Sequence, residues 1–436
     1  MQTIIDQLIA DFHERELPDM TRRQARLPWL PGKVDTVIGM RRSGKTWFLY
    51  QVMRELFKEG FPAKALLYLN FEDERLMPIT PSDLQQIPDT FYRRYPHLKD
   101  RQCVYFFDEI QNVQGWERFV RRLLDFENAH ICLTGSSSRL LSTEIATSLR
   151  GRSLSTEIFP FSFAEFLEHA GFDSRLDRHP GSKRRAVLEN RFSAYLDVGG
   201  FPEVQGLTHH HRIRVLQEYL DVVVLRDLIE RHGITNVLAL RYMIRHLLNS
   251  PAGLFSVQKF FNDLKSQGIP CGKNTLHQFF EYLADVYLFF PVSLHTNSER
   301  ARMVNPRKVY TVDTGLVRAC SRNTTPDWGH LLENFVFMEL RRRTGQIEYY
   351  KTQRGREVDF YAVDPSGTIS LIQSAASMQD KKTAEREISA LSEAMEECGA
   401  AEASIVTFNT EKSLETNSGP IHIVPAWKWA LSHDQT

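Results

Sequence analysis

Gly39-Met40-Arg41-Arg42-Ser43-Gly44-Lys45-Thr46 is the stretch that decides the fold of this chain, because it matches the pattern G-x-x-x-x-G-K-[ST] of a phosphate-binding loop. Gly39 and Gly44 allow the backbone to form a nest whose N–H groups point at phosphate oxygens. We expect Lys45 to reach the β- and γ-phosphates of ATP and the Thr46 hydroxyl to ligate Mg²⁺. The predicted nucleotide contacts are Gly39, Arg41, Arg42, Ser43, Gly44, Lys45, Thr46 and Trp47.

The residues on either side of the loop support this interpretation. Residues 34–38 predict a short buried strand that leads into it, and residues 47–56 predict a helix that leaves it. The positive N-terminal end of that helix adds to the attraction for phosphate. The alternative, a chance match in a surface loop, would not require the strand or the helix.

Two carboxylates follow a second apolar strand, residues 103–107. We expect Asp108 to hold Mg²⁺ through water. Glu109 points differently and is predicted to polarise the attacking water as the catalytic base. A strand inserted between the phosphate-loop strand and this one marks the branch of ATPases that carries its own glutamate, and residues 64–71 supply a strand between the two in sequence. The sequence therefore predicts a parallel sheet with helices on both faces.

Further catalytic groups are predicted after a third strand, which begins at residue 129. Ser136 is the preferred hydroxyl for contact with the γ-phosphate or the catalytic water, with Thr134 and Ser137 as alternatives. Arg150 or Arg152 can reach a γ-phosphate, in the same chain or from a neighbouring subunit. Arg152 is preferred because it leads directly into the next strand. A local carboxylate partner is the alternative role for either arginine.

Composition limits the classes of function. Lysine plus arginine equals aspartate plus glutamate at 54 each, so no overall field attracts the chain to nucleic acid or anionic lipid, and any such contact must be local. The five cysteines form no C-x-x-C motif. No apolar run approaches the roughly 20 residues of a membrane helix, and no signal peptide is apparent. We expect a reducing, cytoplasmic setting without membrane contact.

The order of motifs resembles prokaryotic AAA+-like ATPases, which pair an N-terminal ATPase with a C-terminal domain of largely unassigned role. The stretches that carry the resemblance are residues 39–46, 68–73, 107–111, 133–136, 149–152, 159–163, 199–203, 310–316, 332–336 and 357–360. The resemblance covers nearly the whole chain and implies ATP binding and hydrolysis. The resemblance does not indicate in which biological pathway the protein acts.

Four regions are expected in the α/β chain. They are an ATPase core (1–162), a helical lid (163–240), a winged-helix-like region (241–305) and a restriction-nuclease-like domain (306–436). The lid should contain a long amphipathic helix over residues 212–228.

The winged-helix-like region offers a modest basic surface. Its second helix should expose Lys273, Asn274 and His277 to a major groove, and Arg300, Arg302, Arg307 and Lys308 follow closely. A module that contacts protein or packs internally is an equally good interpretation.

The last region departs from an active nuclease. The restriction-nuclease-like pattern consists of a glutamate on a helix, an aspartate on a strand, and a third motif on the next strand that contains a carboxylate and a lysine. Glu333 and Asp359 fit the first two positions of this magnesium site. The third motif instead contains Gln373 and Ala375 in place of the carboxylate and the lysine. Because a neutral amide is a poor ligand for a hard cation, we expect no nuclease activity. The basic residues Arg341, Arg342, Arg343, Lys351, Arg354 and Arg356 can still hold a phosphate backbone, or form a solvated basic face.

These observations predict Mg²⁺-dependent ATP hydrolysis coupled to a conformational switch on DNA or RNA. The alternative is a nucleotide-gated switch or scaffold that binds another protein. Arg152 acting from a neighbouring subunit would require a homo-oligomer.

Overall fold

The structure is a computed structural model that describes residues 1–135, 149, 151–173, 175, 180–322 and 325–432. The chain forms two units. The first consists of Met1–Phe159 with Asp285–Tyr287, and the second of Pro160–Ala284 with Leu288–Thr436. In the described part of the chain, no helix is both long enough and apolar enough to cross a bilayer.

The first unit is built on a five-stranded parallel sheet in the order β2-β3-β4-β1-β5. Its strands are β1 (Val34–Ile38), β2 (Leu66–Asn70), β3 (Cys103–Asp108), β4 (Ala129–Gly135) and β5 (Ser153–Glu157). The strand between β1 and β3 is therefore β4. We expected the strand at residues 64–71 to be the inserted one. That expectation is wrong, because this strand, β2, forms one edge of the sheet.

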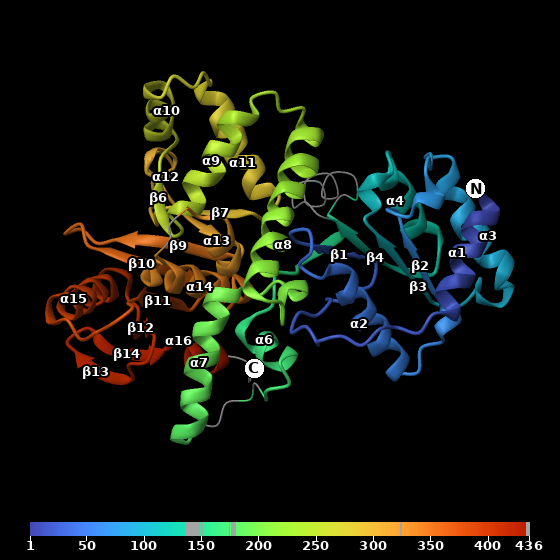
Figure 1. Ribbon diagram of the computed structural model, residues 1–436. Coiled ribbons are helices and arrows are strands. Elements are labelled where there is room, and N and C mark those ends of the chain that lie inside the picture. The colour runs from blue at the N-terminus through green and yellow to red at the C-terminus, as the bar shows by residue number, and fades with distance from the viewer. Residues whose placement is uncertain (136–148, 150, 174, 176–179, 323–324, 433–436) are drawn as a thin grey trace. The chain divides into compact units, whose positions relative to one another are not determined.

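Helices cover both faces of this sheet, as predicted (Figure 1). They are α1 (Gln2–Glu14), α2 (Lys45–Lys58), α3 (Gln86–Arg94) and α4 (Trp116–Phe126). Phe48 and Val52 of α2 share an apolar core with Val37 and Phe106. Phe107, the next residue along β3, instead contacts Phe119 of α4. This alternation along β3 places α2 and α4 on opposite faces.

The second unit begins with helices. They are α6 (Phe163–His169), α7 (Ser182–Val198), α8 (His209–Val222) and α9 (Val237–Asn249). Helix α8 continues directly into a π-helical segment, η8 (Val223–Glu230), so the predicted long helix forms over residues 209–230.

A small antiparallel sheet follows, in the order β6-β8-β7. In chain order this part contains β6 (Gly253–Phe255), α10 (Val257–Ser266), α11 (Lys273–Asp285), β7 (Phe289–Val292), α12 (Glu299–Val304) and β8 (Arg307–Thr311).

A six-stranded mixed sheet completes the second unit, in the order β13-β14-β12-β11-β10-β9. Its elements are α13 (Thr314–Cys320), α14 (Trp328–Arg343), β9 (Gln346–Lys351), β10 (Glu357–Val363), β11 (Ile369–Ser374), α15 (Lys381–Cys398), β12 (Ala403–Thr407), β13 (Lys412–Thr416), β14 (Gly419–Pro425) and α16 (Ala426–Ser432). Helix α15 lies beside this sheet (Figure 1), and its Leu391 shares an apolar core with Leu371 and Ile405.

Candidate functional site

The loop between β1 and α2 has the backbone of a phosphate cradle. Gly39 and Gly44 have φ angles of 149° and 99°, in the region that favours glycine. A Cβ atom on Gly39 would lie 2.2 Å from the carbonyl oxygen of Ile158. Arg42 also has a positive φ, 65°. The first glycine of the motif is thus required both by its conformation and by the close approach of β5.

Lys45 is buried at the first turn of α2. Its Nζ atom donates hydrogen bonds to the carbonyl oxygens of Gly39 and Met40, at 3.1 and 3.2 Å. The same ammonium lies 3.8 Å from Oε1 of Glu109. Lys45 and Glu109 are therefore together, although 64 positions separate them in the sequence.

Thr46 and Asp108 are in direct contact. The Thr46 hydroxyl donates to Oδ2 of Asp108 at 2.8 Å, and the Tyr68 hydroxyl donates to the same oxygen at 3.0 Å. The Thr134 hydroxyl donates to Oδ1. Burial raises the pKa of Asp108, and the bonds from Thr134, Thr46 and Tyr68 act against that rise. The carboxylate is held by three hydroxyls at the carboxyl end of the sheet.

Glu109 adopts a conformation unusual for glutamate, with φ at 53°. Its N–H donates to the Thr134 hydroxyl at 2.9 Å, and the Gln111 amide donates to its Oε2. The left-handed backbone turns the chain directly after Asp108, so that adjacent carboxylates point differently, as predicted. Thr134 bonds to both residues.

The loop has a further internal support, Arg23, that the sequence did not reveal. This buried guanidinium donates to the carbonyl oxygens of Ser43, at 2.9 Å, and Phe159. The backbone N–H of Arg23 donates to Oε1 of Gln51 on α2, at 2.6 Å. An isolated arginine before the first strand carries no spacing signal, so only the folded chain identifies it.

Two of the predicted contacts lie on the rim of the loop. Arg41 forms an ion pair with Glu72 at 3.1 Å. The Trp47 side chain is 48% exposed, with its ring 6.2 Å from that of Tyr50. Ser136, Ser137 and Arg150 lie outside the described residues.

The structure does not bring Arg152 to this site. Its carbonyl oxygen accepts the N–H of Val34 at the start of β1, and its guanidinium pairs with Asp125. The phosphate loop follows the other end of β1, roughly 16 Å away at about 3.3 Å per residue. Within one chain, Arg152 therefore has the alternative role, in which it binds a local carboxylate.

In the second unit, the predicted nuclease-like residues surround a lysine. The Nζ atom of Lys308 lies 2.8 Å from Oδ1 of Asp359, 2.9 Å from Oε1 of Glu333 and 3.0 Å from Oε1 of Glu357. Burial alone would lower the pKa of Lys308, but the three carboxylates raise it overall. Burial also raises the pKa of Glu333 to about 8. The expectation that Lys308 belongs to a basic surface is wrong, because its side chain is buried.

The third motif of this domain supports Asp359 through uncharged groups. Oε1 of Gln373 accepts the N–H of Asp359 at 3.1 Å, and the Ser374 hydroxyl donates to its Oδ2 at 2.9 Å. Ala375 is buried in the core under α15. Gln373 therefore supports Asp359 by a hydrogen bond, and Ala375 contributes to the apolar core.

Other basic residues of this unit are largely bound by their neighbours. Arg342 donates to the carbonyl oxygen of Pro160 at 2.6 Å, and the guanidinium of Arg343 lies 4.5 Å from the centre of the Trp429 ring. Arg354 and Arg356 both pair with Glu393. Lys273, Asn274 and His277 on α11 are exposed, as predicted.

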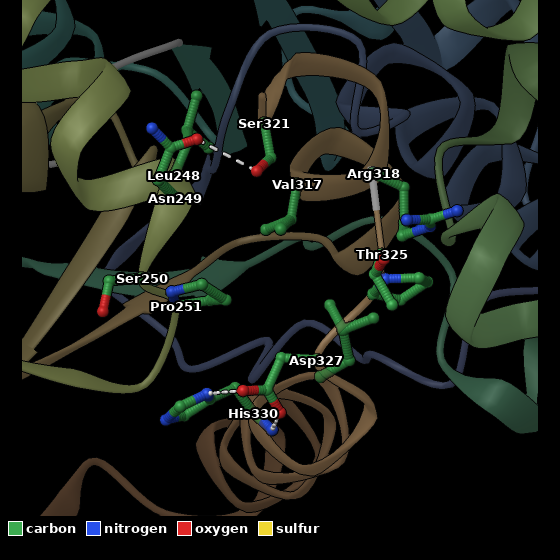
Figure 2. Close-up of a pocket in the computed structure, with 12 residues that line it drawn as sticks. Leu248, Asn249, Ser250, Pro251, Val317, Arg318, Ser321, Thr325, Asp327 and His330 are labelled. Carbon is green, nitrogen blue, oxygen red and sulfur yellow. Dashed lines mark hydrogen bonds and ion pairs between the residues drawn. The ribbon is translucent and has the colours of Figure 1, made fainter. Parts of the chain in front are cut away.

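A pocket of about 120 Å³ lies between α9, α13 and the start of α14 (Figure 2). Two pairs of its polar side chains bond to one another. The Ser321 hydroxyl donates to Asn249 at 3.0 Å, and His330 lies 2.7 Å from Asp327. The predicted site residues do not line it.

Three family models match successive parts of the chain. A family model described as an AAA domain matches residues 32–167. Models described as domains of unknown function, DUF8612 and DUF4143, match residues 189–327 and 328–429. Among solved structures, the ORC1 protein of Aeropyrum pernix in complex with DNA is 13% identical, with a TM-score of 0.30, over 74% of this chain and 91% of its own.

Two relatives match much of the chain. An uncharacterized protein of Haemophilus influenzae is 30% identical over 76% of this chain and 79% of its own length. An uncharacterized protein of Methanocaldococcus jannaschii is 35% identical over 94% of this chain and 91% of its own length. The chain therefore belongs to the family of the Methanocaldococcus protein, and it carries an AAA domain followed by two domains of unknown function.

Proposed function

We propose that this protein binds ATP with Mg²⁺ and hydrolyses it at the end of the sheet where Gly39–Thr46 meets Asp108 and Glu109. The observation that carries this proposal is the 2.8 Å hydrogen bond from Thr46 to Asp108. It joins the hydroxyl and the carboxylate that such enzymes use around the metal, and the Lys45 ammonium lies 3.8 Å from the adjacent carboxylate of Glu109.

The residues present fit a magnesium ion and a triphosphate. Thr46 and Asp108 offer the oxygen ligands that Mg²⁺ prefers. Gly39 allows the loop to keep its cradle conformation, because a Cβ atom there would lie 2.2 Å from the carbonyl oxygen of Ile158. When bound, the ion would neutralise charge that develops on the β- and γ-phosphates. Lys45 would exchange its loop carbonyl partners for phosphate oxygens.

Glu109 is the proposed general base, and Thr134 its positioning residue. Thr134 accepts the Glu109 N–H and donates to Asp108, so one hydroxyl fixes both carboxylate residues. Gln111 holds Oε2 of Glu109. A carboxylate fixed in this way can accept a proton from the attacking water without first reorganising.

Phosphate release tests this proposal directly. We expect the purified chain to hydrolyse ATP with Mg²⁺ present and to stop when EDTA is added. Size-exclusion chromatography with and without ATP would show whether an oligomer forms. Absence of hydrolysis in monomer and oligomer alike would contradict the proposed activity.

We further propose that nucleotide turnover switches contact with nucleic acid. The order α9-β6-α10-α11-β7-α12-β8, with β8 central in the small sheet, supports the winged-helix interpretation. Lys273, Asn274 and His277 are exposed on α11, the helix that would enter a groove.

Binding to duplex and single-stranded DNA, measured at several salt concentrations with and without ATP, tests this switch. Reversal of charge at Lys273 should weaken binding and reduce its salt dependence. Lys382→Glu, an exposed lysine on α15, is the matched control and should change binding little.

The alternative partner is a protein. It is favoured by the internal pairing of Lys308, Arg354 and Arg356, which removes them from a phosphate-binding surface. Absent or salt-insensitive DNA binding in every nucleotide state would support this alternative. Nucleotide-dependent capture of one defined protein partner would then be the next measurement.

A further inference from the structure

Three side chains with metal-ligand chemistry meet within the five-stranded sheet. Asp35 is on β1, and His130 and Cys132 are on the neighbouring strand β4. Their ligand atoms all lie within 4.8 Å of one another. We propose that Asp35, His130 and Cys132 form a binding site for a divalent cation of the zinc type.

The register of the sheet brings these residues together. Asp35 is paired with Cys132 in the parallel ladder between β1 and β4. His130 precedes Cys132 by two positions, so its side chain points to the same face. All three groups therefore stand on strands, which hold ligands more rigidly than loops do. Asp35 is four residues before Gly39, roughly 13 Å along the strand, so this site is distinct from the phosphate loop.

The buried carboxylate of Asp35 is only partly hydrogen-bonded. Its side chain is fully buried, and Oδ2 lies 2.7 Å from Nε2 of His130. Its other oxygen, Oδ1, has no hydrogen-bond partner among the described residues. A buried polar atom without a partner is energetically costly, and a bound ion is one of the arrangements that would satisfy it. The surroundings, which include Leu27 and Val37, are apolar and offer no compensation.

The three groups match the preferences of zinc. Thiolate, imidazole and carboxylate are its usual ligands, and three protein ligands leave a fourth position for water or another group. Two ligands at about 2.0–2.3 Å from one tetrahedral ion are roughly 3.3–3.7 Å apart, so side-chain rotations that move the ligand atoms by about 1 Å suffice. The hydrogen bond between Asp35 and His130 would open, because the ion would take both atoms as ligands. The ring of Trp29 lies 4.4 Å from that of His130 and covers it.

The thiol must lose its proton for this ion to bind. Binding would release that proton, and the affinity should therefore increase with pH. The bound ion would join β1 to β4, whose carboxyl ends lead to Gly39 and Thr134. It would thus stabilise the sheet that carries the proposed ATP site, whether or not ATP is hydrolysed.

Cobalt is a suitable probe, because a cobalt–thiolate bond absorbs in the near ultraviolet. Full-length protein would be treated with a chelator, cleared of it, and titrated with Co²⁺. We expect the thiolate band to saturate at one equivalent and Zn²⁺ to abolish it by competition. Cys132→Ala should remove the band. Asp35→Asn should weaken binding by more than about 100-fold, the upper range for residues that only support a ligand.

The control is Cys103→Ala, which removes another buried thiol from the same sheet and should leave the band unchanged. The exposed residues His209–His211 can bind Co²⁺ but give no thiolate band. Failure of the wild-type protein to develop the band, or its survival in Cys132→Ala, would overturn the proposal. Either result would mean that Cys132 is not a ligand and that Asp35 and His130 only contact each other. Circular dichroism checks the fold of each variant, and the wild-type titration does not depend on the variants.

Discussion

Nζ of Lys308 lies 2.8 Å from Oδ1 of Asp359, so an ammonium group occupies the centre of the carboxylate cluster in the C-terminal domain. Glu333 and Glu357 complete its surroundings. Lys308 comes from β8 of the small sheet, and Asp359 from β10 of the six-stranded sheet. A cation supplied by the chain itself therefore links two sheets among the carboxylates that the sequence analysis assigned to a nuclease-like site.

Lys308→Met should strongly destabilise the second unit. Removing one partner of a buried ion pair leaves uncompensated charge and typically costs about 3–5 kcal/mol. Urea unfolding followed by circular dichroism would measure the loss. Lys351→Met is the control, because Lys351 lies 3.7 Å from Glu357 and is 39% exposed, and such pairs contribute about 0–1 kcal/mol. Adding Asp359→Asn to Lys308→Met should recover part of the loss. Equal effects of the two lysine variants would contradict a structural role for Lys308.

The loop and the carboxylates of the proposed nucleotide site could be located from the sequence because their signal is local. The spacing from Gly39 to Thr46 is imposed by the phosphates, and the apolar runs before Gly39 and Asp108 are imposed by a buried parallel sheet. The structure confirms the predicted sheet and the helices on both faces. The contacts of Lys45 with Glu109 and of Thr46 with Asp108 follow from strand order, since the carboxyl ends of parallel strands meet at one edge.

The remaining features depend on contacts across long stretches of sequence. Lys308 follows three arginines and resembles part of a basic surface, but Asp359 is 51 positions away. Arg23 meets Phe159 across 136 positions. Contacts between residues so far apart produce no recognisable motif in the sequence. Arg152 is different, because a residue directly before a parallel strand lies at the end of the sheet opposite the phosphate loop.

Lys45→Ala and Glu109→Gln should separate binding from hydrolysis. Loss of the Lys45 ammonium should abolish ATP binding, measured with a fluorescent nucleotide. Glu109→Gln should bind ATP but release phosphate about 10²–10⁴-fold more slowly, the usual contribution of a general base. Glu59→Gln, an exposed residue after α2, should hydrolyse ATP normally. If Glu109→Gln retained the wild-type rate, another residue would have to act as the base.

Thr134→Val should lower kcat and change ATP affinity little. The substitution removes the hydroxyl that bonds to Oδ1 of Asp108 and to the N–H of Glu109. A hydrogen bond to a charged group contributes about 1.5–3 kcal/mol, which corresponds to roughly 10–100-fold in rate. Thr134→Ser keeps a hydroxyl and should restore most of the activity. An unchanged kcat in Thr134→Val would exclude a positioning role.

Asp313 should make the stability of the second unit depend on pH. Its side chain is buried and accepts the N–H groups of Gly200, at 2.6 Å, and Leu316, at 2.9 Å. Burial raises the pKa of Asp313 from 3.8 to about 6. The folded state therefore binds a proton more readily than the unfolded state does, and this contribution is full below pH 3.8 and lost as the pH rises through about 6. Asp313→Asn does not titrate. The free energy of unfolding of the wild type, minus that of Asp313→Asn, should thus increase as the pH falls from about 7.5 to about 5 in urea titrations. Parallel profiles for the two proteins would show that Asp313 titrates as it does in the unfolded chain.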